Sequence, residues 1–175
     1  MPDARHTSPG SDPIRSHPNV QRVRSALDAL GVHTEITVLD GAARTAAQAA
    51  DFLGIIVGQI ASSLVFTAHS HDEVAPTPLL VLTSGAHRVD TTTLAASLGL
   101  ASIGRADAEL VRASTGFVIG GVPPVGHLAP VRTLVDVALA GYDTIWAAAG
   151  HPHTVFETTY DELVRITGGQ PAEVG

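Results

Sequence analysis

The sequence has no cysteine, no lysine and few aromatic residues, and these shortages limit its chemistry. Without cysteine, the chain has no disulfide bonds, no thiolate metal site and no cysteine nucleophile. All ten of its basic side chains are arginines. Aromatic residues make up 4% of the chain and apolar residues 45%, so we expect a core built mainly from Val, Leu, Ile and Ala.

Long apolar segments are also absent. No run approaches the roughly 20 residues of a membrane-spanning helix, and the first residues, Met1 to His6, contain no apolar signal-peptide core. The net charge of −7 argues against a stand-alone nucleic-acid binder, because phosphate neutralisation supplies most non-specific affinity. We therefore expect a cytoplasmic protein with neither a membrane nor a DNA partner.

The length of 175 residues and the hydrophobic pattern predict one α+β domain, residues 18–169, between flexible tails at 1–17 and 170–175. Val20, Val23 and Leu27 are spaced to share one helical face. Helices are predicted at 20–30, 45–53, 90–98, 107–113 and 159–168, and strands at 33–39, 63–68, 78–83, 117–122, 131–135, 142–149 and 153–157. Short helices among many strands favour α+β over a repeating βαβ order.

The segment from Thr115 to His127 has the most unusual pattern. A hydrophobic run leads into paired glycines, then two prolines, then another glycine and a histidine. Glycine lets the backbone approach a ligand closely, and proline stiffens the loop. The free N–H groups of such a loop are suited to a carboxylate, carbonyl or phosphate oxygen. The alternative is an ordinary tight turn between two strands.

Three further segments accompany this loop: Ser62-Ser63-Leu64-Val65-Phe66, Leu134-Val135-Asp136 and Trp146-Ala147-Ala148-Ala149-Gly150. In their order and spacing, the four segments resemble the YbaK family, which is related to the editing domain inserted in bacterial prolyl-tRNA synthetases. The resemblance implies a mixed, largely antiparallel, barrel-like sheet surrounded by short helices. It also implies that a G-x-x-x-P loop, Gly120 to Pro124, shapes the pocket for the aminoacyl group of a mischarged tRNA.

One position departs from the family. Members that deacylate tRNA usually carry a lysine directly before the Ser/Thr-Leu-Val-Phe strand, and here that position is Ser62. No neighbouring lysine replaces it through a shift in register, because the chain has none. Either this branch of the family works differently, or it does not hydrolyse tRNA esters.

The resemblance also suggests which residues meet the substrate. The expected substrate-binding residues are Ser62, Gly120, Gly121, Pro124, Gly126, Asp136 and Gly150. On sequence alone, Asp136 is either the N-cap of the next segment or a pocket residue that holds a substrate amine. His153 is the nearest match to a functional histidine of the synthetase editing domains, and it would position water or act as a base.

The nine histidines raise the question of a metal site. His69 and His71 form one H-x-H pair in a polar loop, and His151 and His153 form another. Zinc requires three or four ligands, and no third ligand is recognisable beside either pair. We therefore predict no metal and no other cofactor.

Two functions remain open. The first is a free-standing trans-editing hydrolase that deacylates tRNA mischarged with a small amino acid. Its partners would be the tRNA acceptor end, bound weakly and transiently, and an aminoacyl-tRNA synthetase. The alternative is a non-catalytic pocket protein that binds an amino acid, a nucleotide or a partner, and the missing lysine is its main support.

Overall fold

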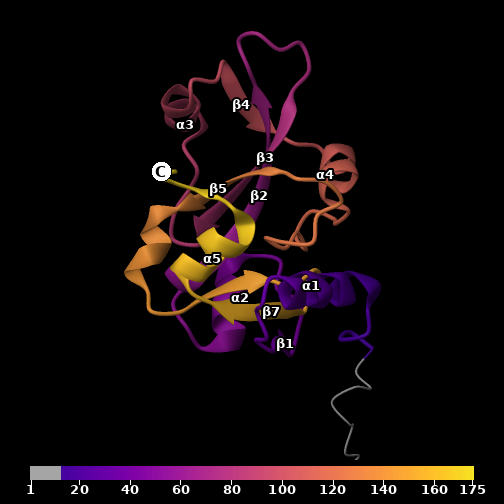
Figure 1. The fold of residues 1–175 in the computed structure, drawn as a ribbon. Coiled ribbons are helices and arrows are strands. Elements are labelled where there is room, and N and C mark those ends of the chain that lie inside the picture. The colour runs from indigo at the N-terminus through magenta and orange to yellow at the C-terminus, as the bar shows by residue number, and fades with distance from the viewer. Residues whose placement is uncertain (1–12) are drawn as a thin grey trace, which may run out of the picture.

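The computed structural model describes residues 13–175 and contains one eight-stranded sheet with helices packed around it (Figure 1). The helices are α1 (Pro18–Ala29), α2 (Ala46–Leu53), α3 (Thr91–Leu98), α4 (Ala108–Thr115) and α5 (Tyr160–Thr167), with 3₁₀ helices η1 (Val57–Gln59) and η2 (Val137–Gly141). The strands are β1 (Ile36–Val38), β2 (Ile60–His69), β3 (Thr77–Ser84), β4 (Ser102–Arg105), β5 (Arg132–Asp136), β6 (Ile145–Ala148), β7 (Thr154–Thr158) and β8 (Gln170–Ala172).

The strands follow the order β1-β7-β6-β2-β3-β5-β8, and β4 pairs with β2 beside this path. The pairs β1–β7, β6–β7, β2–β3 and β2–β4 are antiparallel, whereas β2–β6, β3–β5 and β5–β8 are parallel. The predicted α+β class and mixed sheet are confirmed. Within residues 13–175 the sheet stays open, with β1 and β8 at the two ends of its path.

Strand β2 has a gap along one edge. On its other edge, β3 pairs with it continuously from Ala61 to Ala68. On the gapped edge, β6 pairs only with Ile60 and Ala61, and β4 pairs only from Phe66 to His69. No described strand therefore pairs with residues 62–65 on this edge, although they lie in the middle of the sheet.

The two faces of the sheet carry different layers. Side chains alternate along a strand, so Leu80 and Leu82 of β3 pack with α1, α4 and α5, whereas Leu79 and Val81 pack with α3 on the opposite face. Helix α2 packs with Ile60 and Trp146 in a third, smaller cluster. The core is aliphatic, as the composition predicts, with Phe117 and Phe156 as its largest fully buried side chains.

Helix starts follow local capping signals. Thr45 Oγ1 accepts from the Gln48 N–H at 3.2 Å, while Gln48 Oε1 accepts from the Arg44 N–H at 2.8 Å. The side chains of Asp90 and Thr159 cap α3 and α5 by accepting from the Thr93 and Glu162 N–H groups. A side-chain oxygen satisfies amide groups that the first turn of a helix leaves unpaired, which is why these starts are readable from sequence.

The strand predicted at 117–122 is wrong. These residues form an irregular loop in which the Gly121 N–H donates to the Val118 oxygen at 3.0 Å. Gly120 has a φ of +90°, and the two prolines that follow have no N–H to give to a neighbouring strand. The expected strand at 33–39 shortens to β1, and that at 142–149 shortens to β6.

The C-terminal tail expected at 170–175 is ordered. Its first residues form β8, which runs parallel to β5, and Val174 is buried against α3. The Asp90 N–H donates to the Val174 oxygen at 2.7 Å, so this strand also ties down the start of α3. In the expected N-terminal tail, residues 1–12 lie outside the described part. His17, however, caps α1, and the Arg15 guanidinium donates to the Ile36 oxygen.

Candidate functional site

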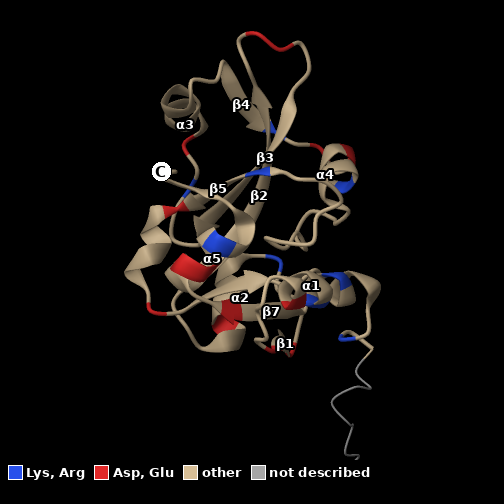
Figure 2. Ribbon diagram, viewed as in Figure 1, with Lys and Arg blue, Asp and Glu red and all other residues tan. Residues whose placement is uncertain are grey.

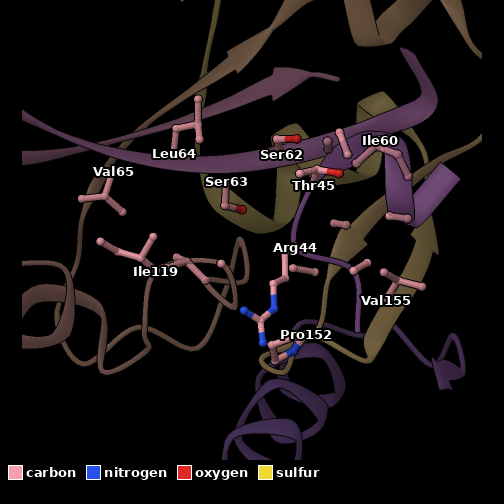
Figure 3. Close-up of a pocket in the computed structure, with 18 of the residues that line it drawn as sticks. Arg44, Thr45, Ile60, Ser62, Ser63, Leu64, Val65, Ile119, Pro152 and Val155 are labelled. Carbon is pink, nitrogen blue, oxygen red and sulfur yellow. The ribbon is translucent and has the colours of Figure 1, made fainter. Parts of the chain in front are cut away.

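A cavity of about 580 Å³ opens at the gap in β2. It reaches both faces of the strand, because its lining includes every residue from Ile60 to Phe66. Figure 3 shows Ser63 and Val65 on one side of β2 and Leu64 on the other. Part of the remaining wall comes from α2 and the residues before it, from β6, and from His151, Pro152 and the start of β7. The rest comes from Arg105 and Ala106, from Val111 of α4, and from the glycine loop, Thr115 to His127, through Ile119, Gly120 and Val122.

The backbone of β2 leaves polar groups free at this gap. The Gly85 N–H donates to the Ile60 oxygen at 2.8 Å, so the backbone groups of Ile60 point toward β3. Because these directions alternate along a strand, the N–H and C=O groups of Ser63 and Val65 point into the gap. The side-chain oxygen of Ser63 is also buried, and it has no hydrogen-bond partner among the described residues.

The cavity is positively charged although the protein is acidic. Arg44 and Arg105 line it, and none of the described lining residues is Asp or Glu. Figure 2 shows acidic residues on α2, α4 and α5 and in the hairpin loop that joins β2 and β3. The charge of −7 thus describes the outer surface, and the cavity itself suits a negatively charged ligand.

The structure brings His151 to the cavity, and His153 lies outside its lining. The His151 ring stands 5.3 Å from both the His17 and the His153 ring centroids. Burial, followed by the charges of His17 and His153, lowers the pKa of His151. Its Nδ1 accepts from the His153 N–H at 3.1 Å, so the neutral ring carries its proton on Nε2.

These three histidines do not form a metal centre. Within residues 13–175, no group of three or more His, Cys, Asp or Glu side chains is arranged to hold a metal ion.

Residues 13–175 include no helix with the length and apolar character needed to cross a bilayer.

Of the four residues in the glycine loop that were predicted to bind substrate, only one lies at the cavity. Gly120 lines the cavity, but Gly121, Pro124 and Gly126 do not. The Gly121 N–H is already used within the turn, so it is not free to bind a ligand. His127 closes the loop by donating from Nε2 to the Pro123 oxygen at 2.7 Å, and burial lowers the pKa of this histidine. The loop is therefore a preformed wall with one exposed glycine at the cavity.

Asp136 and Gly150 support the site from outside its lining. Asp136 is 1% exposed. Its Oδ1 accepts from the Ala138 N–H at 2.9 Å, and its Oδ2 accepts from the Ser84 N–H at 3.0 Å. His87 Nδ1 lies 3.0 Å from the same Oδ2. Of the two interpretations of Asp136, the cap therefore describes its contacts, and its oxygens are occupied by the protein.

Gly150 has a φ of +97° and lies against α1. A Cβ at this position would stand 2.9 Å from the Asn19 oxygen. Glycine therefore lets the chain pass close to α1 and turn His151 toward the cavity.

The sequence relationships agree with this geometry. A model of the aminoacyl-tRNA editing domain matches residues 40–166, most of the chain. The protein belongs to the aminoacyl-tRNA editing domain family. The resemblance inferred from the four short segments is confirmed.

One solved structure and two sequence relatives illustrate what this chain is similar to. A crystal structure described as a "putative trans-editing enzyme for prolyl tRNA synthetase" superposes with a TM-score of 0.80 at 40% identity, covering 90% of this chain and 97% of that one. Among sequence relatives, YwhH of Bacillus subtilis is 26% identical over 83% of this chain and 88% of its own length. The "Putative Cys-tRNA(Pro)/Cys-tRNA(Cys) deacylase EbsC" of Enterococcus faecalis is 25% identical, over 74% and 76% respectively.

Among the polar and charged residues of the cavity, sequence reasoning did not assign Ser63, Arg44, Arg105 or His151 to the site. Ser63 was quoted only as part of a strand, because its direction depends on the register with β3. Arg44 directly precedes the Thr45–Gln48 capping box, but nothing in that local motif indicates a cavity. Of the predicted substrate-binding residues, Ser62 and Gly120 lie in the lining.

Proposed function

We propose that this protein is a trans-acting deacylase that hydrolyses the ester of tRNA mischarged with a small, uncharged amino acid. Family membership supports the general class of reaction. The observation that carries the proposal is the cavity itself. It combines two arginines, a neutral histidine, unpaired strand groups and no carboxylate, a set that fits an aminoacyl ester on a polyanionic chain.

The unpaired edge of β2 would seat the aminoacyl group. Because the lining offers no carboxylate, the α-ammonium binds acceptor oxygens instead, namely the carbonyls of Ser63 and Val65 and the Ser63 hydroxyl. N–H groups on the same edge would donate to the ester carbonyl and stabilise the negative charge that develops there. The polar groups that the sheet leaves unpaired would thus recognise the α-ammonium group and the ester carbonyl, which all aminoacyl esters share.

Hydrolysis follows from this placement. Water adds to the ester carbonyl carbon, the tetrahedral intermediate collapses, and the bond to the ribose oxygen breaks. The ribose oxygen takes up a proton, and the products are a free amino acid and uncharged tRNA. His151 lies at the cavity wall with its Nδ1 already accepting from the His153 N–H, so its Nε2–H would donate a hydrogen bond to an oxygen of the substrate or of the attacking water.

The walls favour a small side chain. Alanines contribute much of the apolar lining: Ala43, Ala46, Ala49, Ala61, Ala106, Ala147 and Ala148. Methyl groups of this kind offer no hydrogen bonds to a long polar side chain, and a basic side chain would lose its hydration without meeting a carboxylate among the described lining residues. Substrates carrying Ala, Ser or Cys meet these conditions.

A deacylation assay tests the proposal directly. Purified protein is mixed with tRNAPro charged with Ala, Ser, Cys or Pro and with control tRNAs charged with Glu or Lys, and amino acid release is followed over time. Release of a small amino acid well above spontaneous hydrolysis is expected, with the Glu and Lys esters spared. Spontaneous rates across the whole panel would overturn the proposed function and favour a binding protein.

A further inference from the structure

Arg44 is a cation in the cavity for which residues 13–175 provide no counter-ion. Figure 3 shows its side chain extending into the cavity, with the guanidinium beside Pro152. Among the described residues Arg44 takes part in no ion pair. With no Asp or Glu in the lining, its charge is free for a ligand.

The base of this side chain is held in place. The backbone N–H of Arg44 donates to Gln48 Oε1 at 2.8 Å, which fixes the backbone of the residue at the start of α2. The neighbouring Ala43 N–H donates to the Pro152 oxygen at 2.8 Å, which ties this segment to the part of the cavity wall formed by His151 and Pro152. A fixed backbone beneath a free guanidinium is the arrangement of a binding residue, because less conformational freedom is lost when the ligand binds.

Arg44 lines the same cavity as Ser62, the position that corresponds to the family lysine. Side chains alternate along β2, so Ser62 shares the face of Ile60, and Ile60 packs against α2. Arg44 stands just before α2, and both Arg44 and Ser62 line the same cavity. A cation that enters from the start of α2 therefore reaches the same cavity as a lysine at position 62 would.

We propose that Arg44 replaces the missing family lysine and binds a phosphate of the single-stranded tRNA acceptor end. This inference rests on the proposed function and assigns one residue within it. Guanidinium suits the task, because its planar donors bind two phosphate oxygens at once and its charge persists at any physiological pH. In this chain the cation would thus stand in the segment before α2 instead of on β2.

The test is a mutational cycle between positions 44 and 62. The variants are Arg44→Ala, Arg44→Gln, Ser62→Lys, and Arg44→Ala combined with Ser62→Lys. Arg132→Ala is the matched control: it removes the same charge from an exposed position on β5, on the far side of β3 from the gap. Circular dichroism verifies the fold, and two readouts are taken: kcat/KM for deacylation and the salt dependence of binding to an RNA minihelix ending in CCA.

Arg44→Ala and Arg44→Gln should each lower kcat/KM by about ten-fold or more, as expected for loss of a charge-assisted contact. They should also reduce the slope of log affinity against log salt by roughly 0.7, the value for one phosphate contact on a single strand. Arg132→Ala should match the parent protein. In the Arg44→Ala background, adding Ser62→Lys should restore much of the lost kcat/KM and minihelix affinity. In the parent protein the same substitution should raise them less, because one phosphate needs one cation.

The outcomes separate this inference from the proposed function. If the parent protein deacylates tRNA and both Arg44 variants match it, Arg44 has no such role and the function stands. If the parent binds the minihelix without hydrolysis, the proposed function fails, while weaker binding by the Arg44 variants still supports the assignment. A parent protein that neither hydrolyses nor binds overturns both.

Discussion

Gly150→Ala probes the contact that places His151 at the cavity. The residue has a φ of +97°, in a region that costs an L-residue about 1–2 kcal/mol. Its new Cβ would also stand 2.9 Å from the Asn19 oxygen and 3.1 Å from Val23 Cγ2, both on α1. Because the closest atom belongs to the backbone, α1 must shift, and overpacking of this kind costs about 1–3 kcal/mol. The free energy of unfolding should therefore fall by about 2–5 kcal/mol in total.

Gly31→Ala is the matched control for this substitution. Gly31 has a similar conformation, with a φ of +77°, but a Cβ there would meet nothing within 4 Å. It should therefore show only the conformational cost of about 1–2 kcal/mol. Urea denaturation of the parent and both variants gives the three stabilities. The difference between the variants isolates the contact with α1, and equal losses would refute the argument that close packing demands glycine at position 150.

Three further predictions concern the same site. Ser63→Ala removes a buried hydroxyl that lacks a partner, so the fold should keep or gain stability while kcat/KM for deacylation falls about ten-fold; a parallel loss of stability would point to a structural role instead. Burial lowers the pKa of His127 and His151, whereas an unfolded chain titrates near 6.5. The unfolded state thus binds more protons below that pH, and the free energy of unfolding should fall as pH drops through 6.5 and below. In the His127→Gln variant, the free energy of unfolding should fall less steeply as pH decreases. An unchanged slope would show that His127 does not contribute to this pH dependence. Finally, elemental analysis should find no stoichiometric zinc, and chelators should leave deacylation unchanged; one tightly bound zinc per chain, lost together with activity, would contradict this.

Parts of the fold were predictable because their signals are local. Thr45, Asp90 and Thr159 each cap a helix through an N–H three residues ahead, so the sequence around them suffices. The apolar runs that became β2 and β3 were likewise recognised as strands. The family could be recognised because each of its four segments is a short, continuous run of residues.

Other parts depended on partners far away in the chain. Residues 170–172 contain Gln and Pro and look like a tail, yet they form a strand because the edge of β5 is available to pair with them. Residues 117–122 look like a strand, yet they form a loop whose amide is used within its own turn. In both cases the hydrogen-bond partner, rather than the local composition, determined the structure.

The sequence by itself determined the α+β class, the aliphatic core, the helix starts and the family. Only the tertiary structure decided the site. The cavity exists because β6 and β4 pair with opposite ends of one edge of β2. Residues 62–65 lie between them and have no strand partner on that edge. The register with β3 turns the backbone of Ser63 into that gap, and the packing of α2 delivers Arg44 to it. These are long-range pairings, and no window of the sequence contains both partners.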